Sequence, residues 1–426
     1  MNIDLQKIKK IFFVGIGGVG ISAIARMMFL EGKDVFGSDM SENQLTRELS
    51  ELGIKITIGQ SFELIPPDTD LIVYTIAIPH YDPRLFEQIK NSSIAYRSYP
   101  QMLGIVTANK NTIAVSGTHG KTTTTAMIAK ILIDAGRDPS VIVGSLLKDF
   151  KSNLIVGKSD LFVVEACEYE RSFLNIKPKI LVILNIEPDH LDYYKDLDDI
   201  KNAFDQLSSQ SEKVISDYSK YLDKVPKLLV PGKHNRMDAA AALAVADMLG
   251  VDEDVAQKSL AEFSGTWRRL EKRGQTEGGT IVYDDYAHHP TEVKASLQAL
   301  RELYPHTNNI GVGVYPEGVK KITVLFQPHL YSRTKALFDD FVKCFEGADQ
   351  VLLLPIYFAR EDKDPTISSE ILAEAITGTG QKAQAFTDFD SAERAVSALN
   401  LGPDDIFVTM GAGEAYKVAD KVLPLV

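Results

Sequence analysis

Short runs of apolar, often β-branched residues alternate with stretches of helical periodicity along the whole chain. Parallel sheets flanked by helices produce this alternation, because their strands are buried on both faces and their helices on one. The pattern therefore predicts an α/β fold. The predicted strands form three series, at residues 11–14, 34–37 and 70–75, at residues 113–116, 161–165, 180–185 and 213–216, and at residues 281–285, 321–327, 350–355 and 405–410.

The chain length agrees with three domains. A single hydrophobic core rarely grows beyond about 250–300 residues, and this chain has 426. We place one domain on each strand series. The predicted domains are residues 1–108, 109–262 and 263–426.

Composition narrows the class of protein. Hydrophobic residues make up 45% and charged residues 24%, which is typical of a globular chain. The formal net charge of −12 disfavours non-specific nucleic-acid binding, which needs a basic face. Cys167 and Cys344 form no CxxC pair, and no apolar stretch reaches the ~18 residues of a membrane span. We expect a cytoplasmic protein without a membrane segment.

The first predicted strand leads into a glycine-rich loop and then a helical pattern. The glycines are Gly15, Gly17, Gly18 and Gly20. Strand, G-x-G-x-x-G and helix together favour pyrophosphate binding at the helix N-terminus. Ser38 and Asp39 end the next strand, where an acidic side chain would meet a ribose. On this motif alone the ligand could be a nicotinamide, a flavin or another nucleotide, and a turn without a ligand is the plainer alternative.

A second glycine loop follows residues 113–116. It reads Gly117, Thr118, His119, Gly120, Lys121, Thr122 and Thr123, with helix formers after it. The spacing is shorter than the standard phosphate loop, which would place glycine where Val115 stands. Backbone N–H groups can still cradle phosphates, with Lys121 on the β/γ oxygens and Thr122 on Mg²⁺. We expect Lys121 to face solvent from this loop and to contribute little to stability.

Polar residues follow several later strands. Glu165 ends one strand, and the segment 185–190, with Glu187 and His190, follows the next. Carboxyl ends of parallel strands meet at one edge of a sheet, so both groups should lie near the phosphate loop and could hold a divalent ion. Solvated loop residues are the alternative.

The last strand series has its own polar clusters. Arg268 and Arg269 stand at the predicted boundary, where an arginine could close onto a γ-phosphate or form a surface charge pair. Residues 284–290 and 326–334 follow strands and outline one face of a cleft.

Eight segments in order resemble the Mur ligase family. They read GIGGVGISAIA, GTHGKTTTTAM, EACEYERSFL, NIEPDHLDYY, GKHNRMDAAAA, FSGTWRRLE, YDDYAHHPTEV and FQPHLYSRT. The resemblance covers most of the chain. It implies a Rossmann-like N-terminal domain for a UDP substrate, a P-loop-type central ATPase domain, and a Rossmann-like C-terminal domain for an amino acid.

The resemblance also implies roles for individual residues. The first glycine loop would hold the UDP of UDP-N-acetylmuramic acid, with Ser38 and Asp39 nearby. Thr122, Glu165 and His190 would bind Mg²⁺. The remaining ATP contacts would come from His234 and Asn235 at the adenine, Asp285 at the ribose, and Arg268 or Arg269 at the γ-phosphate. His288, His329 and Arg333 would surround the incoming L-alanine and the sugar carboxyl.

The mechanism implied is carboxylate activation by ATP through an acyl phosphate, followed by attack of the amine. Lys121, an arginine and Mg²⁺ would supply most of the rate because two anions must meet. A base must free the amine, and the sequence does not choose between His288 and His329.

The chain departs from the family pattern in the central domain. Only fifteen residues link residues 213–216 to Gly232, where the family usually has a longer stretch with extra strands. Asp238 stands at a position where the family often has asparagine. Related ligases carry a carbamylated lysine near residues 203–207, and this segment contains no lysine. Two rivals therefore stay open: a ligase that adds a whole peptide in cell-wall recycling, and an inactive nucleotide-binding regulator.

Overall fold

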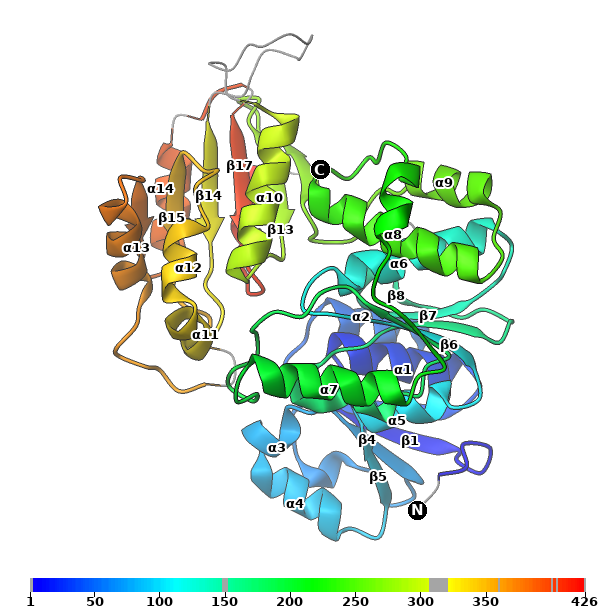
Figure 1. Cartoon of the computed structure of the whole chain (residues 1–426). Coiled ribbons are helices and arrows are strands. Elements are labelled where there is room, and N and C mark those ends of the chain that lie inside the picture. The colour runs from blue at the N-terminus through cyan, green and yellow to red at the C-terminus, as the bar shows by residue number, and fades with distance from the viewer. Residues whose placement is uncertain are drawn as a thin grey trace. The chain divides into compact units, whose positions relative to one another are not determined.

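The computed structural model describes residues 3–147, 152–305, 321–358, 361–399, 401–403 and 405–424. The chain folds into two compact units (Figure 1). The first unit holds Met1–Pro188, Asp196–Pro226 and Ala239–Leu260, and the second holds Asp189–Lys195, Lys227–Asp238 and Ala261–Val426. In the described part of the chain, no helix is long and apolar enough to cross a membrane.

The first unit contains two sheets. The first sheet is parallel throughout, in the order β3-β2-β1-β4-β5. The second has the order β11-β10-β6-β9-β7-β8 and is parallel except for the hairpin of β7 and β8. The strands are β1 (Lys10–Val14), β2 (Asp34–Asp39), β3 (Lys55–Ile58), β4 (Leu71–Tyr74), β5 (Ala95–Ser98), β6 (Asn111–Ser116), β7 (Ser140–Leu147), β8 (Ser152–Ile155), β9 (Leu161–Glu165), β10 (Ile180–Ile183) and β11 (Lys213–Ile215).

Helices connect these strands. They are α1 (Val19–Leu30), α2 (Gln44–Leu52), α3 (Ile78–Tyr81), α4 (Pro83–Asn91), α5 (Tyr99–Thr107), α6 (Lys121–Asp134), α7 (Leu197–Ser209), α8 (Lys233–Met248) and α9 (Glu253–Ala261), with 3₁₀ turns at Phe62–Leu64, Tyr169–Asn175 and Ser219–Lys224. Only the last of these turns lies between β11 and α8, so the short connection predicted for the central region is confirmed.

The second unit is built on one sheet with the order β12-β13-β17-β14-β15-β16, parallel except for β12 and β13. Its strands are β12 (Glu271–Gln275), β13 (Ile281–Asp285), β14 (Ile322–Phe326), β15 (Gln350–Leu353), β16 (Ala383–Ala385) and β17 (Ile406–Met410). Its helices are α10 (Pro290–Leu303), α11 (Tyr331–Ala336), α12 (Phe338–Lys343), α13 (Ser369–Gly378), α14 (Phe389–Ala398) and α15 (Tyr416–Val422).

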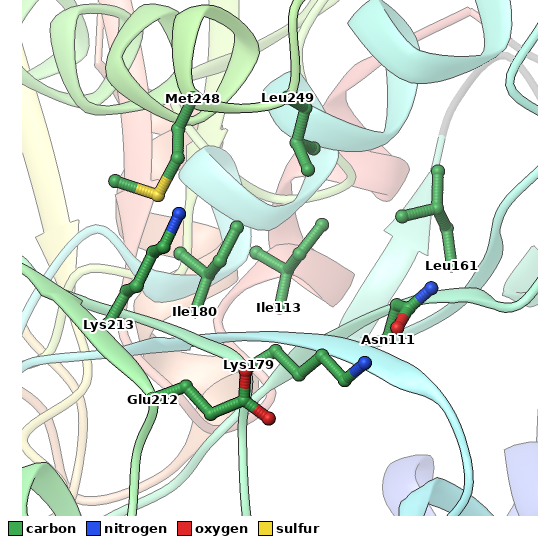
Figure 2. Close-up of a pocket in the computed structure, with 9 residues that line it drawn as sticks. All are labelled: Asn111, Ile113, Leu161, Lys179, Ile180, Glu212, Lys213, Met248 and Leu249. Atoms are coloured by element: carbon green, nitrogen blue, oxygen red, sulfur yellow. The ribbon is translucent and has the colours of Figure 1, made fainter.

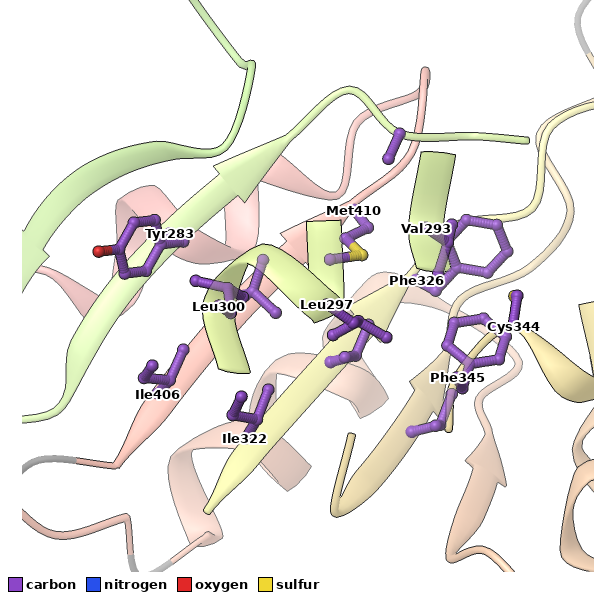
Figure 3. Close-up of a cluster of buried hydrophobic side chains, with 14 of the residues drawn as sticks. Tyr283, Val293, Leu297, Leu300, Ile322, Phe326, Cys344, Phe345, Ile406 and Met410 are labelled. Atoms are coloured by element: carbon purple, nitrogen blue, oxygen red, sulfur yellow. The ribbon is translucent and has the colours of Figure 1, made fainter. Parts of the chain in front are cut away.

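Helices cover both faces of this last sheet. Residues of α10, α12 and α13 pack with Val324, Phe326 and Val408 on one face, the cluster drawn in Figure 3. Residues of α14 and α15 pack with Leu325 and Phe407 on the other. Successive side chains of β14 and β17 therefore enter opposite cores. Burying each large apolar side chain stabilises the fold by about 1.5–3 kcal/mol.

These elements confirm the predicted α/β class and each predicted strand. The predicted domain boundaries at 108/109 and 262/263 stay predictions. One feature was not foreseen: the segments Asp189–Lys195 and Lys227–Asp238 belong to the second compact unit although strands of the first unit precede them.

Candidate active site

The second glycine loop joins β6 to α6. Gly117 and Gly120 have φ of +142° and +84°, values that side-chain-bearing residues rarely adopt, so the turn needs glycine at both positions. Helix α6 begins at Lys121, its N-cap is Gly120, and no side chain caps it. By contrast, Asn43 caps α2, Ser98 caps α5 and Asp196 caps α7. The uncapped N–H groups of α6 can therefore receive an anion.

Lys121 is held inside this turn and does not face solvent, so our expectation about its exposure is wrong. Its Nζ donates to the carbonyls of Gly117 and Thr118 at 2.6 and 3.0 Å and to Glu168 Oε1 at 3.1 Å. The side chains of Lys121 and Glu168 are 13% and 4% exposed. Burial alone would lower the pKa of Lys121, but Glu168 raises it well above its usual value, so the ammonium is charged at neutral pH.

Thr122 and Glu165 meet beside the loop. Thr122 Oγ1 donates to Glu165 Oε2 at 2.9 Å, and the Gly144 N–H of β7 donates to the same oxygen at 2.8 Å. A Cβ at Gly144 would lie 2.7 Å from this oxygen, so only glycine leaves room for the carboxylate. The sequence prediction that Glu165 emerges beside the phosphate loop is confirmed.

The segment that follows β10 forms hydrogen bonds with the second glycine loop through Asn185 and Glu187. The His119 N–H donates to Asn185 Oδ1 at 2.8 Å, and Asn185 Nδ2 returns a bond to the His119 carbonyl at 3.1 Å. The Glu187 N–H donates to Thr118 Oγ1 at 2.9 Å, and Glu187 Oε2 lies 3.4 Å from His119 Nε2. His190 belongs to the second unit, so its role as a metal ligand beside Thr122 and Glu165 stays a prediction.

The first glycine loop has the same design. Helix α1 begins at Val19 after the N-cap Gly18, without a capping side chain. The N–H groups of Gly15 and Ile16 donate to the Ser38 carbonyl at 2.8 and 3.0 Å. The Gly17 N–H donates to Asp39 Oδ2 at 2.8 Å. Ser38 and Asp39 therefore shape the loop itself, while the start of α1 offers donors to an anion.

Gly20 has a separate packing reason. A Cβ at this position would lie 2.5 Å from Cζ of Tyr99, whose ring comes from the start of α5. The glycine therefore lets α1 approach Tyr99 closely.

In the second unit, the Arg268 side chain is buried and forms hydrogen bonds that stabilise the fold. It is 3% exposed, and its Nε donates to Asp284 Oδ2 at 2.7 Å. Its terminal nitrogens donate to the carbonyls of Gly413 and Gly411 at 3.1 and 2.7 Å. The guanidinium also lies 4.6–5.7 Å from the ring centroids of Tyr416, Tyr286 and Trp267, which adds cation–π attraction.

Arg269 is the more accessible of the two arginines. Its side chain is 27% exposed, it lies 5.0 Å from the Tyr286 ring centroid, and its NH1 is 3.8 Å from Glu292 Oε1. Arg269 therefore reaches the surface, whereas Arg268 would first have to break its buried hydrogen bonds to contact a ligand.

Asp285 ends β13 in a dry position. It is 3% exposed, accepts from the Ala287 N–H at 3.2 Å, and accepts a short hydrogen bond from the hydroxyl of Ser296 on α10. Burial raises the pKa of Asp285 from its ordinary 3.8 to about 6, although Ser296 and Arg269 act in the opposite direction. The predicted ribose contact of Asp285 stays a prediction.

His288 and His329 differ in which ring nitrogen carries the proton. His288 Nδ1 lies 3.0 Å from the Tyr286 carbonyl, which can only accept, so Nδ1 is protonated and Nε2 holds the lone pair. His329 Nδ1 lies 3.1 Å from Arg333 NH1, which can only donate, so the proton of neutral His329 is on Nε2. Burial lowers the pKa of His288 to about 4, with Glu292 opposing, so His288 is neutral at pH 7.

Arg333 links His329 to Asp189, which belongs to the same compact unit. It is 7% exposed, and its Nε and NH2 donate to Asp189 Oδ1 at 3.0 and 2.9 Å. Burial alone would raise the pKa of Asp189, but the Arg333 guanidinium holds it well below its usual range. The pair is therefore ionised throughout the physiological range, and Arg333 fixes the ring of His329.

His234 and Asn235 stand at the start of α8. Asn235 is 6% exposed, and its Nδ2 donates to the Pro231 carbonyl at 2.6 Å. A Cβ at Gly232 would lie 2.7 Å from Cε1 of His234, so this glycine leaves space for the imidazole. Burial lowers the pKa of His234 to about 4, so its ring is neutral.

Sequence reasoning missed three contributors: Glu168, Asn185 and the loop 411–414. The carbonyls of Gly411 and Gly413 bind Arg268, and the Glu414 N–H donates to Gln327 Oε1 at 2.7 Å. Two glycines directly after a buried strand were the signal that could have revealed this loop. Glu168 and Asn185 stood inside quoted motifs, but nothing in the sequence showed which side chains they meet.

The residues in Figure 2 line a pocket of about 230 Å³. Asn111, Leu161, Ile180 and Lys213 in its wall begin β6, β9, β10 and β11. The pocket therefore lies at the edge of the sheet opposite the phosphate loop and is separate from the candidate site.

Comparisons with known proteins agree with this geometry. Family models described as Mur ligase family catalytic domain, Mur ligase middle domain, and Mur ligase glutamate ligase domain match residues 10–111, 115–224 and 268–413. The UDP-N-acetylmuramate–L-alanine ligase of Caldanaerobacter subterraneus subsp. tengcongensis is 39% identical, with 99% of each chain covered. The enzyme of the same name from Clostridium botulinum strain Langeland is 37% identical, with 100% of each covered.

Solved structures give the same result. The UDP-N-acetylmuramate–alanine ligase of Thermotoga maritima has a TM-score of 0.80 at 27% identity, covering 97% of this chain and 98% of that one. A murein peptide ligase of Psychrobacter arcticus has a TM-score of 0.67 at 21% identity over the same shares of both chains, a likeness of fold. The chain therefore belongs to the Mur ligase family of ATP-dependent ligases.

Proposed function

We propose that this protein joins L-alanine to the lactyl carboxylate of UDP-N-acetylmuramic acid, with ATP converted to ADP and phosphate. The observation that carries the proposal is the phosphate loop, in which Lys121 is charged inside the turn and the Thr122 hydroxyl donates a hydrogen bond to Glu165. Full-length relatives of the chain are named UDP-N-acetylmuramate–L-alanine ligase. The product would be a precursor of peptidoglycan. Cys167 and Cys344 are free thiols, which fits the cytoplasm proposed for the reaction.

The two uncapped helices suggest how the anionic substrates bind. The start of α1 would receive the pyrophosphate of the UDP-sugar, and the start of α6 the phosphates of ATP. The generic nicotinamide and flavin readings of the first loop are set aside, because the family relatives are named for a UDP-sugar substrate.

Thr122 and Glu165 fit a magnesium ion. A threonine hydroxyl and a carboxylate are hard oxygen donors, the type that Mg²⁺ prefers. The Gly144 N–H would keep the carboxylate oriented while the Thr122 hydroxyl turns to the ion. The ion would neutralise charge on the phosphates. His190 is the third ligand proposed from the family.

The chemistry proceeds in two steps. A lactyl carboxylate oxygen attacks the γ-phosphorus as the bond to the ADP oxygen breaks, giving an acyl phosphate and ADP. The alanine nitrogen then attacks the acyl carbon, the carbon–oxygen bond breaks, and phosphate leaves. Lys121 would stabilise the charge that develops in the first step, and Arg269 is the arginine we assign to the γ-phosphate because Arg268 is committed to buried partners.

We assign the base to His288. L-Alanine arrives as an ammonium ion, and its nitrogen must lose a proton before it can attack. The Nε2 lone pair of neutral His288 can take that proton, whereas Nε2 of His329 is a donor. His329, oriented by Arg333, would then donate to an oxygen of the substrate. His234 and Asn235 would meet the adenine, and Asp285 the ribose.

The experiment that tests this proposal is an omission assay on the purified full chain with ATP and Mg²⁺. ADP should appear only when both UDP-N-acetylmuramic acid and L-alanine are present. ADP formation independent of the UDP-sugar would refute the proposed substrate. Absence of turnover, together with retained ATP binding, would favour the inactive regulator. Domain limits of 1–108, 109–262 and 263–426 remain part of the proposal.

A further inference from the structure

The hairpin of β7 and β8 contacts helix α1, which carries the first glycine loop. Within the hairpin, Val141 pairs with Ile155 and Ile142 with Leu154. Both strands pack against α1. Strands of the predicted ATPase domain therefore touch the helix that would receive the UDP-sugar.

Asn153 of β8 makes the specific contact. It is 0% exposed, and its Nδ2 donates to the Val19 carbonyl at 2.6 Å and to Ser22 Oγ at 2.9 Å. Ser22 Oγ in turn donates to the Val19 carbonyl at 2.8 Å. Val19 is the first residue of α1, so this buried network fixes the turn whose N–H groups follow the glycine loop.

The direction of the Asn153 amide follows from chemistry. The Val19 carbonyl has no hydrogen to donate, so only the NH₂ end of the amide can face it at 2.6 Å. An aspartate of the same size would instead place a carboxylate oxygen against a carbonyl oxygen. The contact therefore requires an amide and not only a side chain of this shape.

The same hairpin also supports the phosphate loop. Gly144 of β7 donates its N–H to Glu165, and Glu165 accepts from Thr122 at the start of α6. Strand β7 of the hairpin therefore orients Glu165, the candidate metal ligand, through Gly144, and strand β8 holds the start of α1 through Asn153.

We propose that Asn153 is a positioning residue for the UDP-sugar. Its hydrogen bonds hold the start of α1, where the UDP-sugar would bind, in a fixed position relative to the strands that support the phosphate loop. The proposal rests on the proposed function, since it assumes that the UDP-sugar binds the start of α1. It predicts that loss of the amide weakens UDP-sugar binding far more than ATP binding.

The test compares Asn153→Asp, Asn153→Leu and Ser22→Ala with the wild-type full chain by calorimetric titration. Asn91→Ala is the matched control, because Asn91 is an exposed asparagine at the end of α4 in the same unit. Each protein is titrated separately with UDP-N-acetylmuramic acid and with a non-hydrolysable ATP analogue. The thermal midpoint reports folding.

We expect the two Asn153 variants to raise the Kd for the UDP-sugar by about tenfold, equivalent to about 1.4 kcal/mol. Ser22→Ala should raise it by about threefold, because one of the two acceptors of the Asn153 amide remains. The Kd for the ATP analogue and both Kd values of Asn91→Ala should stay within about twofold of wild type. KM for the UDP-sugar should rise in parallel with its Kd.

Unchanged UDP-sugar affinity in a folded Asn153 variant would overturn the proposal. A parallel loss of both ligands would also overturn it, since that result indicates a general structural role. Ser22→Ala, a mild change, keeps the test decisive if the Asn153 variants do not fold. A wild-type chain that does not bind the UDP-sugar would instead refute the proposed function.

Discussion

Replacing Lys121 with alanine should both stop turnover and destabilise the protein. The ammonium makes three hydrogen bonds inside the turn, and its partner Glu168 has a side chain only 4% exposed. Removing one member of a buried ion pair costs about 3–5 kcal/mol, because the remaining charge is left without compensation. The lost charge should also raise the activation barrier by roughly 3–4 kcal/mol, a rate loss of about 10²–10³.

A second substitution separates these two effects. Glu168→Gln removes the carboxylate charge that Lys121→Ala would leave without its ammonium partner. The double variant should therefore be within about 1 kcal/mol of the Glu168→Gln single variant, while its turnover stays lost. Lys130→Ala is the matched control, because Lys130 is on the same helix and pairs with the more exposed Asp134 at 2.9 Å. That pair should contribute less than about 1 kcal/mol.

Urea unfolding followed by circular dichroism measures stability, and ADP release measures turnover. A shift of the midpoint at constant slope reports a true change in the free energy of unfolding. If Lys121→Ala were as stable as wild type, the buried pair would not contribute as we infer. If the variant kept wild-type turnover, the assignment of the phosphate loop would be wrong.

Three further predictions follow from the second unit. Burial raises the pKa of Asp285 to about 6 in the folded protein, against 3.8 in the unfolded chain, so the folded state favours the protonated form. The stabilisation that this protonation gives to the folded state is complete below about pH 4 and is lost as the pH rises through 6. Between these pH values, urea unfolding should show that the wild type loses about 3 kcal/mol of stability relative to Asp285→Asn. A stability difference that does not change with pH would contradict the raised pKa of Asp285. Arg268→Ala should lower the free energy of unfolding by about 3–5 kcal/mol. Arg269→Ala should change it by less than about 1 kcal/mol but lower kcat at least about a hundredfold. The opposite pattern would mean that Arg268, and not Arg269, contacts the γ-phosphate. His288→Gln should lower kcat by about 10²–10⁴ with little change in the KM for ATP, and an unaffected kcat would remove His288 as the base.

All interior strands of the three sheets except β7 could be predicted from the sequence, because burial on both faces makes a strand a continuous apolar run. Several missed strands lie at sheet edges, where one side meets solvent and the residues are mixed: β3, β5, β8, β12 and β16. β7 was also missed, although it is interior, because Gly144 interrupts its apolar run.

The sequence predicted only those parts of the candidate site that form short motifs directly after a strand. The glycine loops and Glu165 follow strands, so the topology of a parallel sheet places them. The partners of Lys121 and Arg268 were not predictable, because Glu168 and Gly411 come from distant segments that only the folded chain brings together. The choice between His288 and His329 likewise depended on one hydrogen bond to each ring.

The relatives at 37–39% identity are named for L-alanine, while the structure from Psychrobacter arcticus that shares the fold is named a murein peptide ligase. The central claim is therefore tested most directly by a competition. The full chain is given ATP, Mg²⁺, UDP-N-acetylmuramic acid, and equimolar L-alanine and L-alanyl-γ-D-glutamyl-meso-diaminopimelate, and the UDP-linked products are identified by mass spectrometry. We predict UDP-N-acetylmuramoyl-L-alanine as the product, formed with one ADP per molecule. A product that carries the whole peptide would contradict the account.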